Sequence, residues 1–402
     1  MSVTVVGSLN EDVLVAVDRL PGRGETVVGR DAALAPGGKG ANQAAAAGRL
    51  SGAGVAMVGR VGEDPAGGRQ VAALREAGVD TAGVLATPGT PTGSATIPVE
   101  DGSGENLIVV VPGANAALTP ADVDVPAVRG ADVVLLQLEV PLEAVRAAAD
   151  AASGTVVLTP APPRPLPEEL LRRVDVLVPN EHELVQLAGA GPAGRTPAEL
   201  AELARGLGVT ATVVTLGARG ALVVPADGPA LLQAPPPVRA VDTTGAGDCF
   251  TGALGAALAR GDDLPGAVRE AVAAAALSTT GPGARGGLPD AAAVRALLPR
   301  VPGAQEVEAS EDEAREDEAR EDEAREDDGG SAAGRAGQGP LDHQDGPEED
   351  AVTEPERPPR SPERAEGDPA GEQPDDDGRT PRAEDPAEGQ PMGDGPADTP
   401  GS

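Results

Sequence analysis

The 402-residue sequence contains no Trp, no Tyr and a single Phe. Its core must therefore be built from aliphatic side chains, chiefly Ala, Val and Leu, rather than around aromatic rings. The single cysteine, Cys249, excludes an intramolecular disulfide and a cysteine-based zinc site. We predict that Cys249 is a small buried core residue, with a redox role as the alternative.

The sequence also lacks the features of a secreted or membrane protein. Its first residues do not combine a charged stretch with a long apolar run, as a signal peptide would. No run of about 18 or more apolar residues occurs, so no membrane span is expected. These absences predict a cytoplasmic protein with no membrane partner.

Basic residues are few, and the excess of acidic ones lies at one end. The net charge is −34, and residues 302–402 hold 33 of the 65 acidic residues but only 9 of the 31 basic ones. Such a charge argues against a nucleic-acid partner, because phosphate binding depends on Lys and Arg. The break in composition predicts a folded domain over residues 1–301.

Residues 302–402 are predicted to be a disordered acidic tail, because so few apolar residues cannot offset chain entropy. Three Glu-Asp-Glu-Ala-Arg repeats fill residues 311–325, and their Glu and Arg at i and i+4 favour local helix. We expect a solvating appendage, with a docking segment for a basic partner or cations as the alternative. The sequence identifies no partner for this tail.

Short apolar segments alternate with helical stretches in residues 1–301. Strands are predicted at residues 3–6, 55–58, 133–138, 156–158, 174–178, 212–216 and 221–224. Helices are predicted at residues 41–50, 67–77, 142–152, 181–187, 198–207, 248–260 and 264–277. Repeated βα units predict a three-layer α/β/α fold with a mostly parallel central sheet.

Two regions, residues 12–35 and 92–112, interrupt this alternation. Both contain strand-like stretches with Gly and Pro turns but no helix, and residues 101–104 are a candidate hairpin turn. We predict that these regions form a small second sheet that acts as a lid over a pocket.

The segment Asp242–Asp248 is a Gly-rich turn that leads directly into an Ala-rich helix. Unpaired N–H groups and the helix dipole favour an anion at such a helix start, and Gly245 and Gly247 allow a phosphate to approach closely. Asp248 could accept a proton from an attacking hydroxyl group. Taken alone, this turn is more often an ordinary helix cap.

A second Gly-rich turn, Pro36–Gln43, also opens a helix and carries Lys39, the only lysine in the chain. So scarce a residue is expected where its chemistry has no substitute, which disfavours a plain turn with a solvated lysine. A Walker A loop would need Gly where Ala33 stands, and no Rossmann fingerprint is present. A nicotinamide-dependent enzyme is therefore disfavoured.

The segments Gly37–Asn42 and Asp242–Asp248, each followed by an Ala-rich helix, resemble the two signature motifs of the ribokinase-like carbohydrate kinases. The resemblance covers about residues 1–300. It implies ATP-dependent phosphorylation of D-ribose at its 5-hydroxyl, giving ribose 5-phosphate and ADP. It also implies Asp248 as the catalytic base. The N–H groups of Gly245, Ala246 and Gly247 would then stabilise the transferring phosphoryl group.

Three segments resemble the sugar-binding parts of that family: Gly7–Asp12, Gly37–Asn42 and Gln137–Pro141. Short carboxylates and amides suit vicinal hydroxyl groups. Gly113–Ala116 is a further stretch typical of the family. The implied sugar-binding residues are Asn10, Asp12, Gly38, Lys39, Gly40, Ala41, Asn42, Glu139 and Asp248.

On the nucleotide side, Asn180 and Glu183 match the family's Asn-x-x-Glu, which implies contact with phosphate and Mg²⁺, a cation that prefers oxygen ligands. A helix cap with a solvated face is the alternative. Val272 stands where relatives often place a polar residue near the adenine, which predicts weaker or apolar contacts. The implied ATP-binding residues are Asn180, Glu183, Thr215, Leu216, Gly217, Ala218, Arg219, Gly220, Gly247 and Asp248.

The resemblance further implies an activating K⁺ site, for which a plain Gly-rich loop is the alternative. The matching residues are Asp242, Thr244, Ser278, Gly281, Gly283 and Gly287. Exposed lid strands predict a homodimer formed by sheet pairing.

Two other functions stay open. One is a kinase of the same family that acts on fructose, a nucleoside or a deoxy sugar acid. The other is a non-catalytic sugar sensor whose acidic tail recruits partners, although the complete turn ending at Asp248 argues against it.

Overall fold

The computed structural model describes residues 1–307 except 53, 103 and 192–194. The three acidic repeats and the rest of the predicted tail from residue 308 onward lie outside the described residues. None of the helices in the described part has both the length and the apolar character that crossing a membrane demands.

In the described part of the chain, a ten-stranded sheet has the strand order β14-β13-β12-β11-β10-β9-β8-β1-β4-β5. Neighbours from β11 to β5 pair in parallel, and the strands from β12 to β14 pair antiparallel at one edge. The strands are β1 (Ser2–Val6), β4 (Gly54–Gly62), β5 (Val79–Thr87), β8 (Val133–Gln137), β9 (Thr155–Thr159), β10 (Val176–Leu177), β11 (Ala211–Thr215), β12 (Ala221–Pro225), β13 (Leu231–Gln233) and β14 (Gln305–Glu306).

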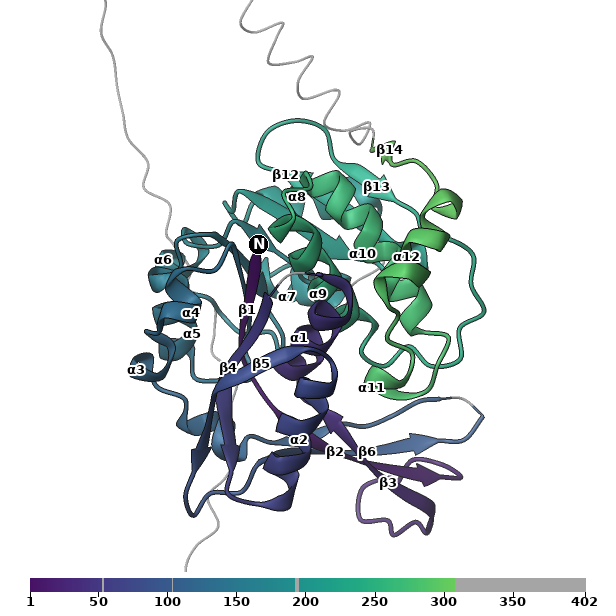
Figure 1. Cartoon of the computed structure of the whole chain (residues 1–402). Coiled ribbons are helices and arrows are strands. Elements are labelled where there is room, and N and C mark those ends of the chain that lie inside the picture. Colours follow the sequence, from purple (N-terminus) through teal and green to yellow (C-terminus); the bar gives the residue numbers. More distant parts are fainter. Residues whose placement is uncertain (53, 103, 192–194, 308–402) are drawn as a thin grey trace, which may run out of the picture. The chain divides into compact units, whose positions relative to one another are not determined.

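Helices cover both faces of this sheet (Figure 1). One layer is α1 (Lys39–Leu50), α2 (Pro65–Glu76), α9 (Ala246–Ala259), α10 (Leu264–Ser278) and α12 (Ala291–Leu297), with the single turn α11 (Gly283–Gly286) beside it. The other is α3 (Pro120–Val123), α4 (Pro126–Arg129), α5 (Leu142–Ala151), α6 (Glu168–Leu171), α7 (Glu181–Leu187) and α8 (Pro197–Arg205). Short 3-10 turns are η1 (Gly113–Ala117), η2 (Gly217–Arg219) and η3 (Leu298–Arg300).

Strand β8 shows why the sequence specifies a sheet covered on two sides. All its residues are buried, and its Val and Leu side chains alternate between the two helical layers. Val133 and Leu135 pack with α1 and α9, whereas Val134 and Leu136 pack with α3 to α6. A continuous aliphatic run is typical of a parallel strand with helices on both faces.

A close approach of α1 and α9 brings the two Gly-rich turns together. A Cβ atom at Gly252 in α9 would lie 2.5 Å from the carbonyl oxygen of Gln43 in α1. Only a glycine permits this separation, and Ala-rich helix faces allow it along their length. The composition of these two helices thus sets the distance between the motifs at their starts.

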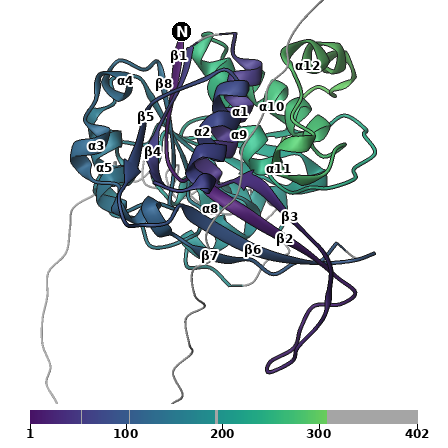
Figure 2. The ribbon, with the colours of Figure 1, turned by 60° about the horizontal axis from the view of Figure 1, so that its bottom comes forward.

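The small second sheet has the order β3-β2-β6-β7 and lies along one side of the main body (Figure 2). Its strands are β2 (Asn10–Val17), β3 (Gly29–Gly37), β6 (Gly93–Glu100) and β7 (Val109–Val111). Strand β2 pairs antiparallel with β3 and in parallel with β6. The predicted small second sheet is confirmed, and both predicted regions contribute strands to it; its role as a lid stays a prediction.

Three strands were not predicted from the sequence: β5 and β14, which lie at the two edges of the sheet, and β13, which lies next to β14. Strand β14 pairs with β13, and Val307 packs against the core beside α7 and α8, so the described fold continues past residue 301. The predicted strand at residues 174–178 is shorter in the structure, where β10 comprises two residues.

Candidate active site

Asp248 lies in the first turn of α9, directly after the Gly-rich turn. Gly245 adopts a left-handed conformation with φ of 74°, and a Cβ atom there would lie 2.8 Å from the Cα atom of Ala284. Glycine is therefore required at this position on two grounds. The turn delivers Asp248 to a buried position, where the residue is 7 % exposed.

Two side-chain amides from the start of α1 hold the Asp248 carboxylate. Asn42 Nδ2 donates to Oδ2 at 3.1 Å, and Gln43 Nε2 donates to Oδ1 at 3.2 Å. Each carboxylate oxygen is thus fixed by one donor and retains a further lone pair for a proton. The structure brings the two sequence motifs together at this carboxylate, and it adds Gln43, which the sequence analysis missed.

Lys39 is half-buried beside the same carboxylate. Asp248 raises the pKa of the Lys39 ammonium most, followed by Glu139 and Glu183, against the opposing effect of burial. The ammonium therefore stays protonated among three carboxylates, and Lys39 and Asp248 line the same cavity. A half-buried cation at this place can act on a transferring phosphoryl group as well as on a sugar.

This cavity has a volume of about 220 Å³ and continues into a larger pocket of about 730 Å³ through shared walls. The cavity is lined by Lys39, Thr159, Ala161, Val178, Asn180, Glu183, Thr215, Thr243, Gly245, Ala246, Gly247, Asp248 and Thr251. A Cβ atom at Gly247 would meet nothing within 4 Å, so the backbone there faces open space. The Ala246 N–H, in contrast, donates to the Thr243 carbonyl oxygen at 3.2 Å.

The larger pocket has an apolar wall. Phe250 and Val272 line it together with residues 235–238, which include three prolines. A flat apolar ring such as adenine suits this surface, and the apolar alternative predicted for Val272 fits it. Gly217, Ala218 and Gly220 also line this pocket, whereas Leu216 is buried and Arg219 pairs with Glu181.

Asn180 and Glu183 cap a helix and also line the cavity at the start of α9. Asn180 Oδ1 accepts from the Glu183 N–H at 2.8 Å, and Glu183 Oε2 accepts from the Asn180 N–H at 2.9 Å. This capping box starts α7. Both side chains also line the 220 Å³ cavity, where burial raises the pKa of Glu183.

On the lid side, Asp12 and Asn10 lie at the start of β2. Gly37 of β3 pairs with Asn10, and a Cβ atom at Gly37 would collide with the Asp12 carboxylate. Burial raises the pKa of Asp12 to about 6. Asn10 Oδ1 accepts from Asn115 Nδ2 at 2.7 Å, and Asn115 Oδ1 accepts from the Leu9 N–H at 2.9 Å.

The turn before α1 is held by Glu139 and Ser8. Glu139 Oε2 accepts from the Lys39 N–H at 3.1 Å and from the Ser8 hydroxyl. Ser8 Oγ accepts from the Gly40 N–H at 3.3 Å, and its carbonyl oxygen accepts from the Ala41 N–H at 2.9 Å. Gly38, with φ of 87°, allows the close approach. These three N–H groups lie in the first turn of α1 and are already paired within the fold, which leaves side chains to contact a ligand.

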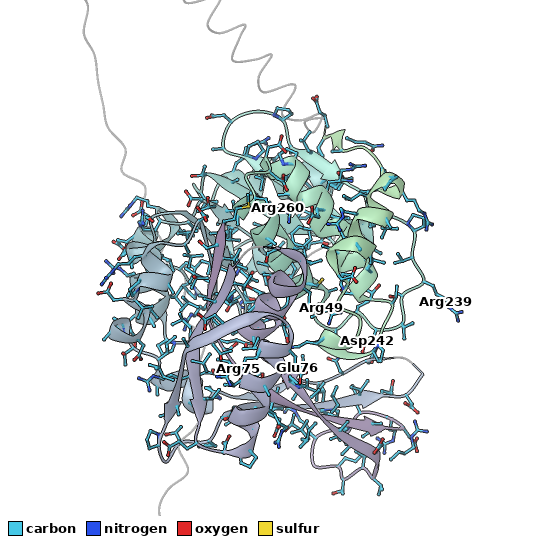
Figure 3. The ribbon with its side chains drawn as sticks, viewed as in Figure 1. Arg49, Arg75, Glu76, Arg239, Asp242 and Arg260 are labelled. Atoms are coloured by element: carbon cyan, nitrogen blue, oxygen red, sulfur yellow. The ribbon has the colours of Figure 1, made fainter. Side chains whose placement is uncertain are left out.

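The residues proposed for a monovalent cation also lie together. Asp242 accepts from the Thr244 N–H at 2.8 Å and from the Gly283 N–H at 2.7 Å, and Figure 3 shows Asp242 beside α11. Gly281 packs on Gly287, which lies against the Ser278 carbonyl oxygen. Within the described residues no group of three or more His, Cys, Asp and Glu side chains could hold a metal.

Arg285 is the charged residue of this site that the sequence analysis missed. Its pKa is lowered to about 10, mainly by burial, while Asp12 and Asp248 act in the opposite direction. Arginine is common in this chain, so its presence alone did not single out Arg285. Its position between Gly283 and Gly287, two residues of the predicted cation site, could have indicated it. Cys249, by contrast, is fully buried, and burial raises the pKa of its thiol to about 12, which favours the predicted core role.

Residues 1–291 match the pfkB family of carbohydrate kinases. The chain is also 39% identical over 306 residues to the ribokinase of Bacillus subtilis, across 74% of this chain and 99% of that one. This chain therefore belongs to the pfkB carbohydrate kinase family, as the two Gly-rich motifs predicted.

Two solved structures are similar to the described fold. The ribokinase of Thermotoga maritima matches with a TM-score of 0.69 and 35% identity, across 74% of this chain and 99% of that one. Arabidopsis thaliana ribokinase complexed with ribose and ATP matches with a TM-score of 0.66 and 35% identity, across 74% and 98%. The predicted three-layer fold with a small lid sheet is confirmed.

Proposed function

We propose that this chain transfers the terminal phosphoryl group of ATP to the 5-hydroxyl of D-ribose, giving ribose 5-phosphate and ADP. The observation that carries the proposal is the position of Asp248, which is joined to the sugar-side motif by Asn42 and lines the phosphate-side cavity. A carboxylate between a hydroxyl and a phosphoryl group is the arrangement that phosphoryl transfer needs. Relatives 39% and 35% identical to this chain carry the name ribokinase.

The sugar is proposed to bind between the lid and the start of α1. Asn10 and Asp12 present an amide and a carboxylate from β2, while Asn42 and Glu139 present the same pair of groups from the other side. Acceptors and amides in such pairs suit vicinal hydroxyl groups. Asp248 then accepts the proton of the 5-hydroxyl as its oxygen attacks phosphorus.

The phosphate groups are proposed to lie in the 220 Å³ cavity at the start of α9. The N–H groups of Gly245 and Gly247, together with the helix dipole and the Lys39 ammonium, stabilise charge on the transferring phosphoryl group. The Ala246 N–H contributes only if it leaves the Thr243 carbonyl oxygen. The adenine lies against the apolar wall of the larger pocket.

Mg²⁺ enters with ATP, as in ATP-dependent kinases of this family, and neutralises charge on the phosphate oxygens. Glu183 faces the cavity and is the carboxylate proposed to hold it, directly or through water, with Asn180 beside it. A K⁺ ion is proposed at the carbonyl oxygens of the α10–α11 loop next to Asp242, where a mostly neutral oxygen set suits a monovalent cation. The Mg²⁺ and K⁺ assignments are based on the kinds of oxygen ligand that these residues offer.

The lid is proposed to form a homodimer interface. Its outer strand β7 is exposed along its length, and Ile108 and Val109 are 61 % and 62 % exposed. Light scattering should then give about twice the 39.7 kDa chain mass. Ile108→Glu should give monomers, whereas Leu85→Glu, at an exposed position of β5, should not. A monomeric wild-type chain contradicts this interface.

A coupled assay of ADP release tests the activity across ribose, fructose, a nucleoside and a deoxy sugar acid. We expect the highest kcat/KM with ribose and a product whose phosphate is attached to C5 by phosphorus NMR. If another acceptor gives a higher kcat/KM than ribose, that acceptor is the preferred substrate and the proposed substrate is wrong. No ADP release with any of them favours the non-catalytic sensor.

A further inference from the structure

Arg285 donates three hydrogen bonds around the sugar side of the site. Its Nε donates to Asn42 Oδ1 at 2.8 Å, and one Nη donates to the Gly37 carbonyl oxygen at 3.1 Å and to Gln70 Oε1 at 3.4 Å. Gln70 in turn donates to the backbone oxygen of Asn10. One guanidinium therefore contacts or reaches α1, α2, β3 and the start of β2.

The contact with Asn42 settles which way that amide faces. A guanidinium has only donors, so the Asn42 atom opposite Nε must be its oxygen. The Asn42 NH₂ group then faces the other way, where it donates to Asp248 at 3.1 Å. Without Arg285 the amide could turn over, and its oxygen would then face the Asp248 carboxylate and repel it.

Local stability does not explain a half-buried arginine at this place. The Nη1 atom is buried and has no hydrogen-bond partner within the described residues, which is costly for a charged group. The neighbouring acids Asp12 and Asp248 do not offset the burial, since the pKa of Arg285 is lowered to about 10.

We propose that Arg285 is a positioning residue that orients the Asn42 amide toward Asp248 and ties the turn before α1 to α11. The role rests on the proposed function only in that Asp248 is the group being positioned. Its effect on turnover passes through Asn42, so loss of either member should remove most of what the pair contributes.

A double-mutant cycle on steady-state kinetics tests this role with wild type, Arg285→Ala, Asn42→Ala and the double variant. Each single change should lower kcat/KM for the sugar by roughly 10- to 100-fold, as expected for loss of a charged or buried hydrogen bond. The kcat/KM of the double variant should be no more than about threefold lower than that of the less active single variant, because both changes break the same chain of contacts. KM for ATP should change by less than about twofold, because these contacts lie on the sugar side.

Arg269→Ala is the matched control, because Arg269 is another arginine that links separate segments by hydrogen bonds, here to the backbone carbonyl oxygens of Leu298 and Val301 away from the site. It should keep kcat/KM within about twofold of wild type. The chain has no Trp or Tyr, so folding is checked by calorimetry and far-ultraviolet circular dichroism rather than fluorescence. If Arg285→Ala does not fold, Arg285→Lys replaces it in the cycle, because one ammonium cannot reproduce the fork of contacts.

The proposal would be overturned if the fold loss in kcat/KM of the double variant equalled the product of the two single losses. An Arg285 variant with wild-type kinetics would also overturn it. A wild-type chain that phosphorylates a different sugar contradicts the proposed substrate but not this role. The cycle is then measured with that sugar.

Discussion

The phosphate side and the sugar side of this site are built by different means. At the start of α9, backbone atoms of Gly245 and Gly247 and an apolar wall line the two cavities, together with side chains such as Lys39. On the lid side the polar groups are side chains held by hydrogen bonds from neighbouring side chains, as Asn10 is by Asn115 and Asn42 is by Arg285. A backbone site is sensitive to added atoms, whereas a side-chain site is sensitive to removed ones.

The Asp12→Asn change should have the largest effect on the sugar side that leaves the phosphate side intact. Removal of a charged acceptor for a sugar hydroxyl should lower kcat/KM for ribose by about 100-fold. KM for ATP should stay within about twofold, because Asp12 does not line either nucleotide-side cavity. Steady-state kinetics with each substrate varied in turn measures both values. An equal rise in KM for ribose and KM for ATP would contradict the distinction between the sugar side and the phosphate side.

The Gly247→Ala change tests the phosphate side by adding one methyl group. Because a Cβ atom there meets nothing within 4 Å, the fold should keep its Tm, while the methyl group occupies space in the cavity. KM for ATP should rise by about tenfold, with KM for ribose nearly unchanged.

Gly245→Ala is the matched control, because it adds the same methyl group at φ of 74° and 2.8 Å from Ala284. It should lower the free energy of unfolding by about 1–3 kcal/mol. Equal Tm losses in both variants would show that Gly247 is needed for folding and not for binding.

Stability should depend on pH through Asp12, whose pKa is raised from 3.8 to about 6 by burial. A raised pKa means that the ionised carboxylate destabilises the folded state. This cost is absent below about pH 4, grows as the pH rises, and is complete above about pH 6. Asp12→Asn should therefore unfold at higher denaturant concentration than wild type at pH 7.5.

The Asp12→Asn advantage is at most about 2 kcal/mol, because Asp12 is partly exposed and therefore partly screened. It should shrink toward zero at pH 4. Denaturant titrations followed by circular dichroism at both pH values check the trend. The same difference at both pH values would show that burial does not control this carboxylate.

Removal of the acidic tail should have the smallest effect. The described fold ends with Val307 packed beside β13, so residues 1–307 retain every group assigned to the two sides. Their kcat and both KM values should match those of the full chain within about twofold. A larger change would assign the tail a catalytic or regulatory role.

Most of the fold could be predicted from the sequence because its strands are buried on both faces. Strands such as β8 and β11 are short aliphatic runs, and this pattern is hard to mistake. The edge strand β5 was missed because it contains Asp80, Thr81 and Gly83, with exposed positions on one face. Partial exposure at a sheet edge weakens the apolar pattern that predicts a strand.

The site was predictable to the extent that its residues are rare or lie in Gly-rich turns. Lys39 stood out as the only lysine, and Asp248 stood out at a helix start. Gln43 and Arg285 were missed because their roles depend on tertiary contacts with Asp248 and Asn42 across more than 200 residues. No local pattern indicates such a contact.

Asp248 belongs to both sides, and the Asp248→Asn change tests the central claim most directly. The new amide has nearly the same shape as the carboxylate but cannot accept the proton. ADP release with ribose should fall by roughly 1,000-fold or more, beyond the loss at either side alone. Calorimetry should still detect ribose binding and a Tm close to that of wild type. Turnover within about tenfold of wild type in a correctly folded Asp248→Asn chain would contradict the assignment of Asp248 as the catalytic base.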